Sequence, residues 1–209
     1  CGTASTVDWM FEITCELAAE LGQALRVARL YSDVSVEALR HARDADRLTP
    51  LHPAQAIDDA ALADMTNIVA LAGAEQIQAA INTGADVVLA GRSTDTATIA
   101  ALPLARGAHA GAAWHGAKIA ECGAFCTTRP ASGVIMVSFD ETGFTVTPMG
   151  EGVQCTPQSV AAHMLYENSD PWILHEPGGH LDVTAASYTE AAQDGVRVEG
   201  AVWVAAGDY

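Results

Sequence analysis

Apolar residues recur at helical spacing near the beginning of the chain. Between residues 8 and 21 they stand at positions 10, 13, 17 and 21, and Gly22 follows directly. Residues three or four positions apart share one face of a helix, and glycine commonly follows a helix end. The pattern predicts an amphipathic helix over 8–21, with Cys15 on its apolar face and in the core.

The next stretches carry the signals of other elements. Alternating apolar residues predict a strand, a serine can cap a helix, and charged residues with prolines are typical of a surface loop. Before residue 84 we predict a strand over 24–31, a helix over 35–42 capped by Ser35, a loop over 44–53 and a helix over 74–83. For residues 60–73 the sequence allows two alternatives. One is a helix that Gly73 interrupts, and the other is a strand over 68–72.

A short apolar strand followed by a glycine turn lies in the middle of the chain. Residues 86–90 read Asp-Val-Val-Leu-Ala, as expected of a parallel strand buried on both faces. The turn that follows contains Gly91, Arg92 and Asp95, at the place where open α/β sheets bind ligands. Arg92 could hold a carboxylate or phosphate there, or it could pair with Asp95 to fix the turn.

The chain's single lysine, Lys118, lies in a predicted helix over 111–122. Burial would lower the pKa of this lysine and make it a base or nucleophile, whereas the nearby Glu121 carboxylate would keep it charged. His115, three positions earlier, could transfer protons near neutral pH. The alternative is an ordinary solvated Lys–Glu pair on a helix surface.

The second half of the chain is predicted to contain more β-strands than the first half. We predict a helix from Ser93 or Thr94 to 101 that Pro103 stops, a hairpin of strands 133–138 and 144–148, a helix from Thr156 to about Glu167, and β segments over 172–174, 181–186 and 196–203. The fold class is therefore α/β, with a Rossmann-like parallel sheet layer in residues 1–130. A mixed, β-richer α+β part follows in 131–209 and is expected to continue beyond the chain end.

Two further groups of residues could carry chemistry. His163, Tyr166 and Glu167 fall on one face of the predicted helix that ends near Glu167. The segment 176–182, Glu-Pro-Gly-Gly-His-Leu-Asp, contains Gly178 and could present backbone N–H groups to an anion or hold a metal. It could equally be a tight turn between two strands.

Composition narrows the functional classes. The 209 residues carry 10 Lys+Arg against 26 Asp+Glu, a formal net charge of −16, so phosphate backbones and anionic membranes would be repelled. No apolar run approaches the roughly 18 residues of a membrane-spanning helix. The chain starts at Cys1 without a secretory signal, which predicts a piece of a longer cytoplasmic protein with reduced thiols.

The five cysteines, at positions 1, 15, 122, 126 and 155, form no disulfide framework. Cys122 and Cys126 are four residues apart and share a helix face with His115, so a zinc or iron site is conceivable. Small buried apolar side chains are the favoured interpretation, and we assign no metal.

Several motifs taken together resemble a known family. GADVVLAGRSTDTATIAALPL, AWHGAKIAECGA, TPQSVAAHMLYENSDP and EPGGHLDVT look like the AtuA-type acyclic terpene utilisation proteins over almost the whole chain. Such proteins are longer at both ends, and their glycine-rich N-terminal region is absent here. The chain looks closer to a WHxxKxxECG branch than to the terpene branch. Cys126 and the strand over 134–140 match nothing in the resemblance.

The resemblance implies breakdown of acyclic terpenoid or other branched or small carboxylic acids, as free acids or CoA thioesters, without an established reaction. The motif positions carried over are Gly91, Arg92, Asp95, His115, Lys118, Glu121, Cys122, Tyr166, Glu167, Asp170, Glu176, Gly178, Gly179 and Asp182.

These observations lead to one functional hypothesis and two rivals. We predict an enzyme with lyase, hydratase or isomerase chemistry and with catalytic residues Lys118, His115, Glu121 and Glu167. The predicted substrate-binding residues are Gly91, Arg92, Asp95, Tyr166, Gly178 and Gly179. No cofactor is assigned, and a homo-oligomer, with a second small subunit as an option, is expected. The rivals are a non-catalytic subunit and a metal-dependent hydrolase with ligands His115, Cys122, Glu176 and His180.

In the hypothesis each residue has a role. Arg92 holds the substrate carboxylate, and Lys118 with His115 moves a proton at the neighbouring carbon. Glu121 sets the charge of the lysine, and Glu167 is the complementary acid or base.

Overall fold

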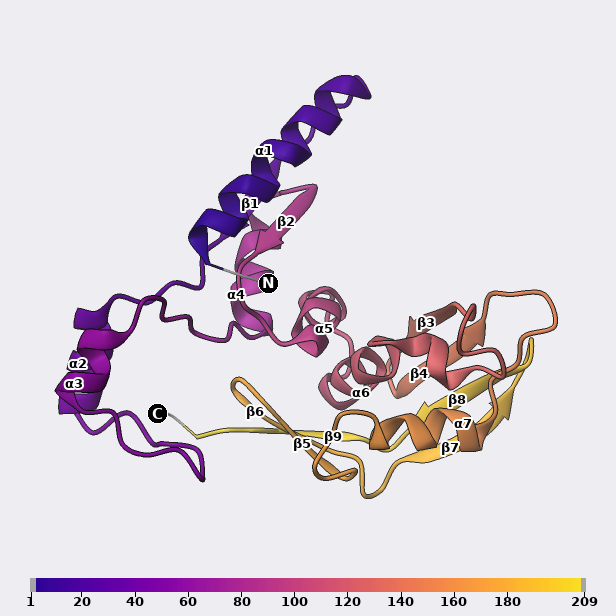
Figure 1. Ribbon diagram of the computed structural model, residues 1–209. Coiled ribbons are helices and arrows are strands. Elements are labelled where there is room, and N and C mark those ends of the chain that lie inside the picture. Colours follow the sequence, from indigo (N-terminus) through magenta and orange to yellow (C-terminus); the bar gives the residue numbers. More distant parts are fainter. Residues whose placement is uncertain (1–2, 208–209) are drawn as a thin grey trace. The chain divides into compact units, whose positions relative to one another are not determined.

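The computed structural model describes residues 3–207 and divides them into two compact units (Figure 1). The first unit comprises residues up to 72, residues 79–93 and residue 207, and the second comprises 73–78 and 94–206. The fold combines helices with parallel and antiparallel sheets, so the α/β class is confirmed. The sequence-based boundary was placed at 130, whereas this division falls at 93, and the helix Ala110–Ala120 packs on strands of the second unit.

The first unit is built on a pair of parallel strands. Strands β1 (Val27–Leu30) and β2 (Val87–Ala90) pair in register from Val27↔Val87 to Leu30↔Ala90. The helices are α1 (Ala4–Glu20), α2 (Val36–Asp44), α3 (Asp59–Asp64) and the second half of α4 (Ala74–Asn82). Among the described residues this parallel sheet has two strands. The structure therefore supports a parallel strand pair, and it supports the Rossmann-like prediction only to that extent.

Ser35 and Gly22, predicted to lie at helix ends in the first unit, do so in the structure. The Ser35 hydroxyl accepts a hydrogen bond from the Ala38 N–H at 3.1 Å, as an N-cap does. Gly22 follows α1 with a φ of 64°, a backbone conformation that favours glycine. In the open stretch 60–73, α3 ends at Asp64, and residues 69 and 72 make only isolated β-bridges, to Asp33 and Ser93.

Burial in this unit is lower than the sequence predicts. Cys15 is exposed and not in the core, because the apolar stripe of α1 packs only through Val7 and Ala18. Strand β2 is half-buried along its length instead of buried on both faces. A two-stranded sheet has an edge on each side, and this leaves its strands less covered than the centre of a wide parallel sheet.

The second unit contains two antiparallel sheets. Its strands are β3 (Ile135–Phe139), β4 (Gly143–Pro148), β5 (Ile173–Glu176), β6 (Gly179–Asp182), β7 (Ser187–Ala191), β8 (Gly195–Glu199) and β9 (Val202–Ala205). The sheet orders are β3-β4-β8-β7 and β5-β6-β9. The predicted hairpin is confirmed as β3 and β4, where the Asp140 carboxylate accepts from the Thr142 and Gly143 N–H groups of the turn. The predicted segment 196–203 is two strands, separated at Gly200, where φ is 89°.

Helix α6 (Ala110–Ala120) is the core element of the second unit, with nine of its eleven residues buried. It packs on α5 (Asp95–Ala105) and on strands of both sheets. Trp114 stacks on Trp203 with ring centroids 4.6 Å apart. Gly116 fits against the Phe139 ring, which a Cβ atom would meet at 2.4 Å. Small residues therefore let α6 approach its neighbours closely on every side.

Two predicted helix ends differ from the structure. Helix α5 continues through Pro103 to Ala105, because a proline in the last turn removes one hydrogen bond without ending the helix. After the helix end, Gly107 adopts a φ of 81°, which turns the chain away from the helix axis. The Ala108 N–H donates a hydrogen bond to the Pro103 carbonyl at 3.0 Å.

Helix α7 (Pro157–Ala162) is shorter than predicted, although its Thr156–Ser159 capping box and the proline at its first position are confirmed. A short 3-10 helix, η2 (His163–Leu165), follows, and Glu167 has a φ of 54°. His163, Tyr166 and Glu167 therefore do not share one helix face. The tertiary reason is that the His163 ring is bonded to the end of α6, which redirects the chain.

Candidate functional site

The end of helix α6 places the single lysine of the chain in a protein interior. The Lys118 Nζ atom lies 2.9 Å from Glu121 Oε2, and the two side chains are 5% and 12% exposed. The pair is therefore withdrawn from water, unlike the solvated surface pair of the alternative interpretation. An ammonium so enclosed needs its carboxylate partner, since an uncompensated buried charge is strongly unfavourable.

Helix α5 supports this pair from the side. The Thr96 hydroxyl, in the first turn of α5, donates to the same Glu121 oxygen at 3.3 Å. Of the two predicted caps, Ser93 and Thr94, it is Thr94 that caps this helix, by accepting from the Ala97 N–H at 3.1 Å. The start of α5 and the end of α6 thus meet at the Glu121 carboxylate.

A second carboxyl group lies at the end of strand β5. Burial raises the pKa of Glu176, and hydrogen bonds from Thr94 and Thr96 partly offset this effect. The negative charge of Glu121 raises the Glu176 pKa further, while the charge of Lys118 lowers it. Within the part of the chain that the structure describes, the Glu176 Oε2 atom is buried without a hydrogen-bond partner. Burial thus makes this carboxyl group a weaker acid than one in water.

These groups line one polar cavity of about 310 Å³. Its wall comes from the start of α5, the end of α6, the segment 167–170 and strand β5. Among the described residues of this wall, Lys118 is the one lysine or arginine, and the carboxylates are Asp95, Glu121, Glu167, Asp170 and Glu176. The site is strongly acidic around a single ammonium group.

Two residues in left-handed backbone conformations flank this cavity. Cys122, directly after α6, has a φ of 50°, and Glu167 has a φ of 54°. Side-chain hydrogen bonds with Cys122 and then Glu167 raise the pKa of Tyr166 to about 12. The Tyr166 ring centroid lies 5.8 Å from the Lys118 Nζ atom. Non-glycine residues hold such conformations only where the surrounding structure enforces them, which happens often at functional sites.

Two histidines near α6 are buried, and burial lowers the pKa of both. Burial lowers the pKa of His115 to about 3, and its Nε2 atom lies 3.0 Å from the Tyr188 hydroxyl. Its side chain is enclosed by the core and does not contribute to the described wall of the polar cavity. The His163 Nε2–H donates to the Glu121 carbonyl at 2.7 Å, and burial foremost lowers the pKa of His163.

A family model matches residues 2–206, described as "Acyclic terpene utilisation family protein AtuA". The chain belongs to the AtuA family. No curated protein matches it, and no solved structure does. The family description links the chain to acyclic terpene utilisation, and the resemblance inferred from the motifs is thereby confirmed.

In this AtuA family member several predicted site residues do come together. Lys118, Glu121, Glu167 and Asp95 line the polar cavity, and Tyr166 lies beside it. Residues that the sequence did not mark as part of this cavity include Thr94, Thr96 and His175. Thr94 carried a helix-cap signal, whereas nothing in the local sequence distinguishes Thr96 or His175.

Other predicted residues have structural surroundings of their own. In the first unit the Arg92 side chain is exposed, and its backbone N–H donates to the Ser32 hydroxyl at 2.7 Å. The Gly91 N–H donates to the Leu30 carbonyl at 2.9 Å. In the second unit, Gly178 forms the β5–β6 turn with a φ of 88°, and a Cβ atom on Gly179 would meet the Val204 carbonyl at 2.3 Å. Their substrate-binding roles stay predictions.

The predicted metal ligands are not gathered in one place. His115 is in the core, Glu176 lines the polar cavity, and His180 lies on β6 opposite His175. Over residues 3–207 the structure forms no group of three His, Cys, Asp or Glu side chains suited to a metal ion. Burial raises the pKa of the Cys126 thiol to about 12, as expected of a small buried apolar residue, and Cys1 lies outside the described residues.

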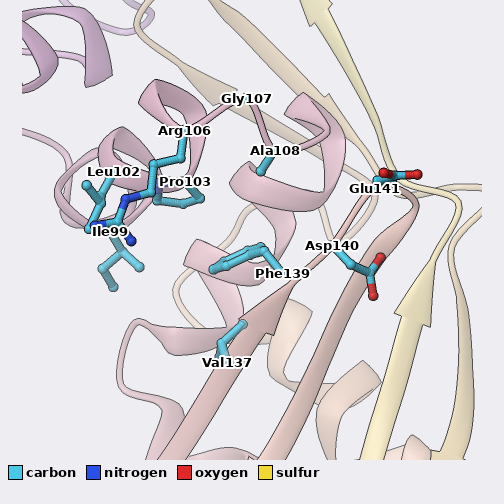
Figure 2. A pocket seen from close by; sticks show the side chains of 10 residues that line it. All are labelled: Ile99, Leu102, Pro103, Arg106, Gly107, Ala108, Val137, Phe139, Asp140 and Glu141. Atoms are coloured by element: carbon cyan, nitrogen blue, oxygen red, sulfur yellow. The ribbon is translucent and has the colours of Figure 1, made fainter.

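A larger cavity of about 730 Å³ lies between the second half of α5 and strand β3 (Figure 2). Ile99, Leu102 and Phe139 give it an apolar lining, with the Arg106 side chain beside the helix and Asp140 at the far end of β3. The Asp140 carboxylate is already paired with Arg197. None of the predicted catalytic residues contributes to the described wall of this cavity.

No helix among residues 3–207 has the length and apolar character needed to cross a membrane.

Proposed function

We propose that the polar cavity at the end of α6 catalyses proton transfer next to the carbonyl of an acyclic, branched acyl compound. The supporting observation is the buried Lys118–Glu121 ion pair. It lines the same cavity as Glu176, a carboxyl group whose pKa is raised by burial. Removing a proton at that carbon is common to lyase, hydratase and isomerase chemistry. The family description supports acyclic terpenoid acids or their CoA thioesters as substrates.

In this proposal Lys118 stabilises negative charge on the substrate. Its Nζ atom lies 2.9 Å from Glu121 Oε2, so the two side chains form an ion pair in the wall of the cavity. An ammonium has three N–H donors, and those not used by Glu121 can bond to the acyl oxygen. When the neighbouring carbon loses its proton, charge develops on that oxygen, and a fixed donor in a water-poor site stabilises it.

Glu176 takes and returns the proton. A general base works best when its pKa lies near the working pH, and burial moves the Glu176 pKa in that direction. The unpartnered Oε2 atom is free to bond to a substrate hydrogen. Glu167, exposed in the wall of the same cavity, stays our predicted complementary acid or base.

The charge of the cavity favours a thioester over a free acid. Five carboxylates surround one ammonium group, so a substrate carboxylate placed beside Lys118 would meet net negative charge. The reacting acyl group of a thioester carries no charge, and its carbonyl can still accept from Lys118. The predicted carboxylate-binding role of Arg92 is a separate prediction, since Arg92 belongs to the first unit.

The test is hydrogen exchange at the substrate carbon. The protein is incubated in D2O with branched acyl-CoA thioesters and with the corresponding free acids, and deuterium uptake is measured by mass spectrometry. We expect exchange with thioesters and a loss of roughly 100-fold or more for Glu176→Gln and for Lys118→Met.

Glu141→Gln, at an exposed position outside this cavity, is the matched control and should exchange at the wild-type rate. Circular dichroism would show that each variant is folded. Because Lys118→Met leaves Glu121 unpaired, the double variant Lys118→Met, Glu121→Gln is measured beside it. Wild-type exchange rates in folded Glu176→Gln would disprove the assignment.

A further inference from the structure

The loop between η2 and strand β5 separates two cavities of opposite character. Residues 167–170 of this loop line the polar cavity that contains Lys118. Leu165, Pro171 and Trp172, at its two ends, line a second cavity of about 510 Å³. We call this second cavity the Trp172 groove. One short segment therefore forms a wall of both spaces.

The Trp172 groove is apolar. Ala161 and Met164 come from α7 and η2, Val183 follows β6, and Tyr188 comes from β7. Of the described residues that line it, none carries a formal charge. The Tyr188 hydroxyl is already bonded to His115, so this residue presents its ring to the groove without an unpaired polar atom. Apart from Gln158 and the bonded Tyr188 hydroxyl, the described lining is apolar, which suits a hydrocarbon.

Its size and exposure fit a small ligand. The volume lies within the roughly 300–1,000 Å³ that is typical of small-molecule sites. Leu165 and Trp172 are 66% and 56% exposed, so two large apolar side chains at the groove are left open to water. Covering them with a hydrocarbon would remove apolar surface from water, which is favourable.

We propose that the Trp172 groove binds the hydrocarbon chain of an acyclic, branched acyl substrate whose carbonyl end lies in the polar cavity. The inference rests on the proposed function for the position of the carbonyl end. Such a substrate has a polar end and an apolar chain, and the loop has a polar and an apolar side to match. The two sites are adjacent along this segment, because Asp170 lines the polar cavity and Pro171 lines the groove.

The cavity between α5 and β3 is the competing location for the chain (Figure 2). It is larger, but Arg106 and Asp140 bring charged groups to its wall. Neither this cavity nor the groove shares a described lining residue with the polar cavity, but Trp172 of the groove closely follows Asp170, which lines the polar cavity. A hydrocarbon chain bound there would respond to substitutions at Leu102 and not at Trp172.

The experiment measures how affinity depends on chain length. The protein is titrated by calorimetry with S-(2-oxoalkyl) thioethers of CoA, which keep a carbonyl but have no thioester bond, as analogues of acetyl-CoA up to a branched decanoyl-CoA. We expect roughly threefold to fourfold tighter binding for each added methylene until the groove is full. We call this gain in affinity per methylene the increment. It should shrink markedly in Trp172→Ala and in Leu165→Ser, while the acetyl-CoA analogue binds to these variants as it does to wild type.

Leu102→Ser is the matched control, because Leu102 is an exposed leucine in the competing cavity. It should retain the full increment. An increment that survives in both groove variants, or one that is lost in Leu102→Ser, would overturn the proposal. So would wild-type affinity that does not grow with chain length.

The two proposals can fail separately. If folded Glu176→Gln exchanges deuterium normally while the increment still depends on Trp172, the proposed chemistry is wrong and the groove assignment stands. If exchange depends on Glu176 but the increment does not depend on Trp172 or Leu165, the groove assignment is wrong.

Discussion

Helices α1 and α6 are both rich in apolar residues but differ in what surrounds them. Helix α1, in the first unit, buries Val7 and Ala18 and leaves Trp9, Met10 and Leu17 exposed. Helix α6, in the second unit, buries nine of eleven residues, including a lysine and a histidine. Apolar character along a helix thus did not decide burial. What decided it was the number of elements that pack on the helix, which alanines and glycines in α6 allow.

The largest contrast is expected between the tryptophans of the two helices. Trp114 in α6 is 2% exposed and stacks on Trp203, whereas Trp9 in α1 is 63% exposed. Trp114→Ala should lower the free energy of unfolding by roughly 3–5 kcal/mol, because it leaves a cavity in the core. Trp9→Ala should change it by less than about 0.5 kcal/mol.

Denaturant unfolding followed by circular dichroism measures both tryptophan variants. Equal losses of stability would show that α1 and α6 are buried to a similar extent, contrary to the comparison.

The ion pairs of the two units should differ in the same direction. Lys118–Glu121 is enclosed, while the Arg29–Asp8 pair is exposed on both sides. Lys118→Met should cost roughly 3–5 kcal/mol of stability, because a carboxylate is left buried without its partner. The double variant with Glu121→Gln should recover much of this loss.

Arg29→Met is the surface counterpart, and water already solvates both of its charges, so the unfolding midpoint should hardly move. Chemical denaturation of all four proteins gives the comparison. A larger loss for Arg29→Met than for Lys118→Met would contradict it.

The last contrast concerns the pH dependence of stability, in which two groups whose pKa is shifted by burial, His115 and Glu176, should act in opposite directions. His115 is neutral in the fold because burial lowers its pKa to about 3 from 6.5. Between these values the unfolded chain binds the extra proton, so stability should fall as pH drops, by up to about 1.4 kcal/mol per pH unit. His115→Gln removes this contribution and should flatten the profile between pH 6.5 and 3.

Glu176 contributes a slope of the opposite sign. Its folded-state pKa is raised above the ordinary value of 4.5, so the folded chain holds the proton more tightly. Stability from this group is present below pH 4.5 and is lost as pH rises through the raised pKa. Unfolding midpoints across this range, compared between wild type and Glu176→Gln, should show the loss only in wild type.

Local patterns were sufficient for most elements. Helix spacing, the Ser35 and Thr94 caps and the β3–β4 turn were all predicted from neighbouring residues, and the structure confirms them. Pro103 misled because its effect depends on where in the helix it falls. The predicted length of α7 was too long. The helix ends before His163, whose ring is bonded to the Glu121 carbonyl, a contact distant in sequence.

The candidate site was predictable only in its local part. Lys118 and Glu121 are one helix turn apart, so their pairing follows from the sequence. His115 lies on the same helix, but three residues turn its side chain by about 60° and shift it by about 4.5 Å. On a helix enclosed on all sides, this is sufficient to give it different neighbours, Phe144 and Tyr188.

The sequence by itself determined many of the helices and strands, the lysine–glutamate pair and membership of the AtuA family, because each depends on residues close together or on motifs in order. It did not indicate β7, and it left residues 60–73 open. Only the tertiary structure decided that this pair is buried, that Glu176 from a later strand joins it, and that the stripe of α1 stays exposed. Burial and the pKa shifts that follow from it are set by what packs against a residue, and those partners come from distant parts of the chain.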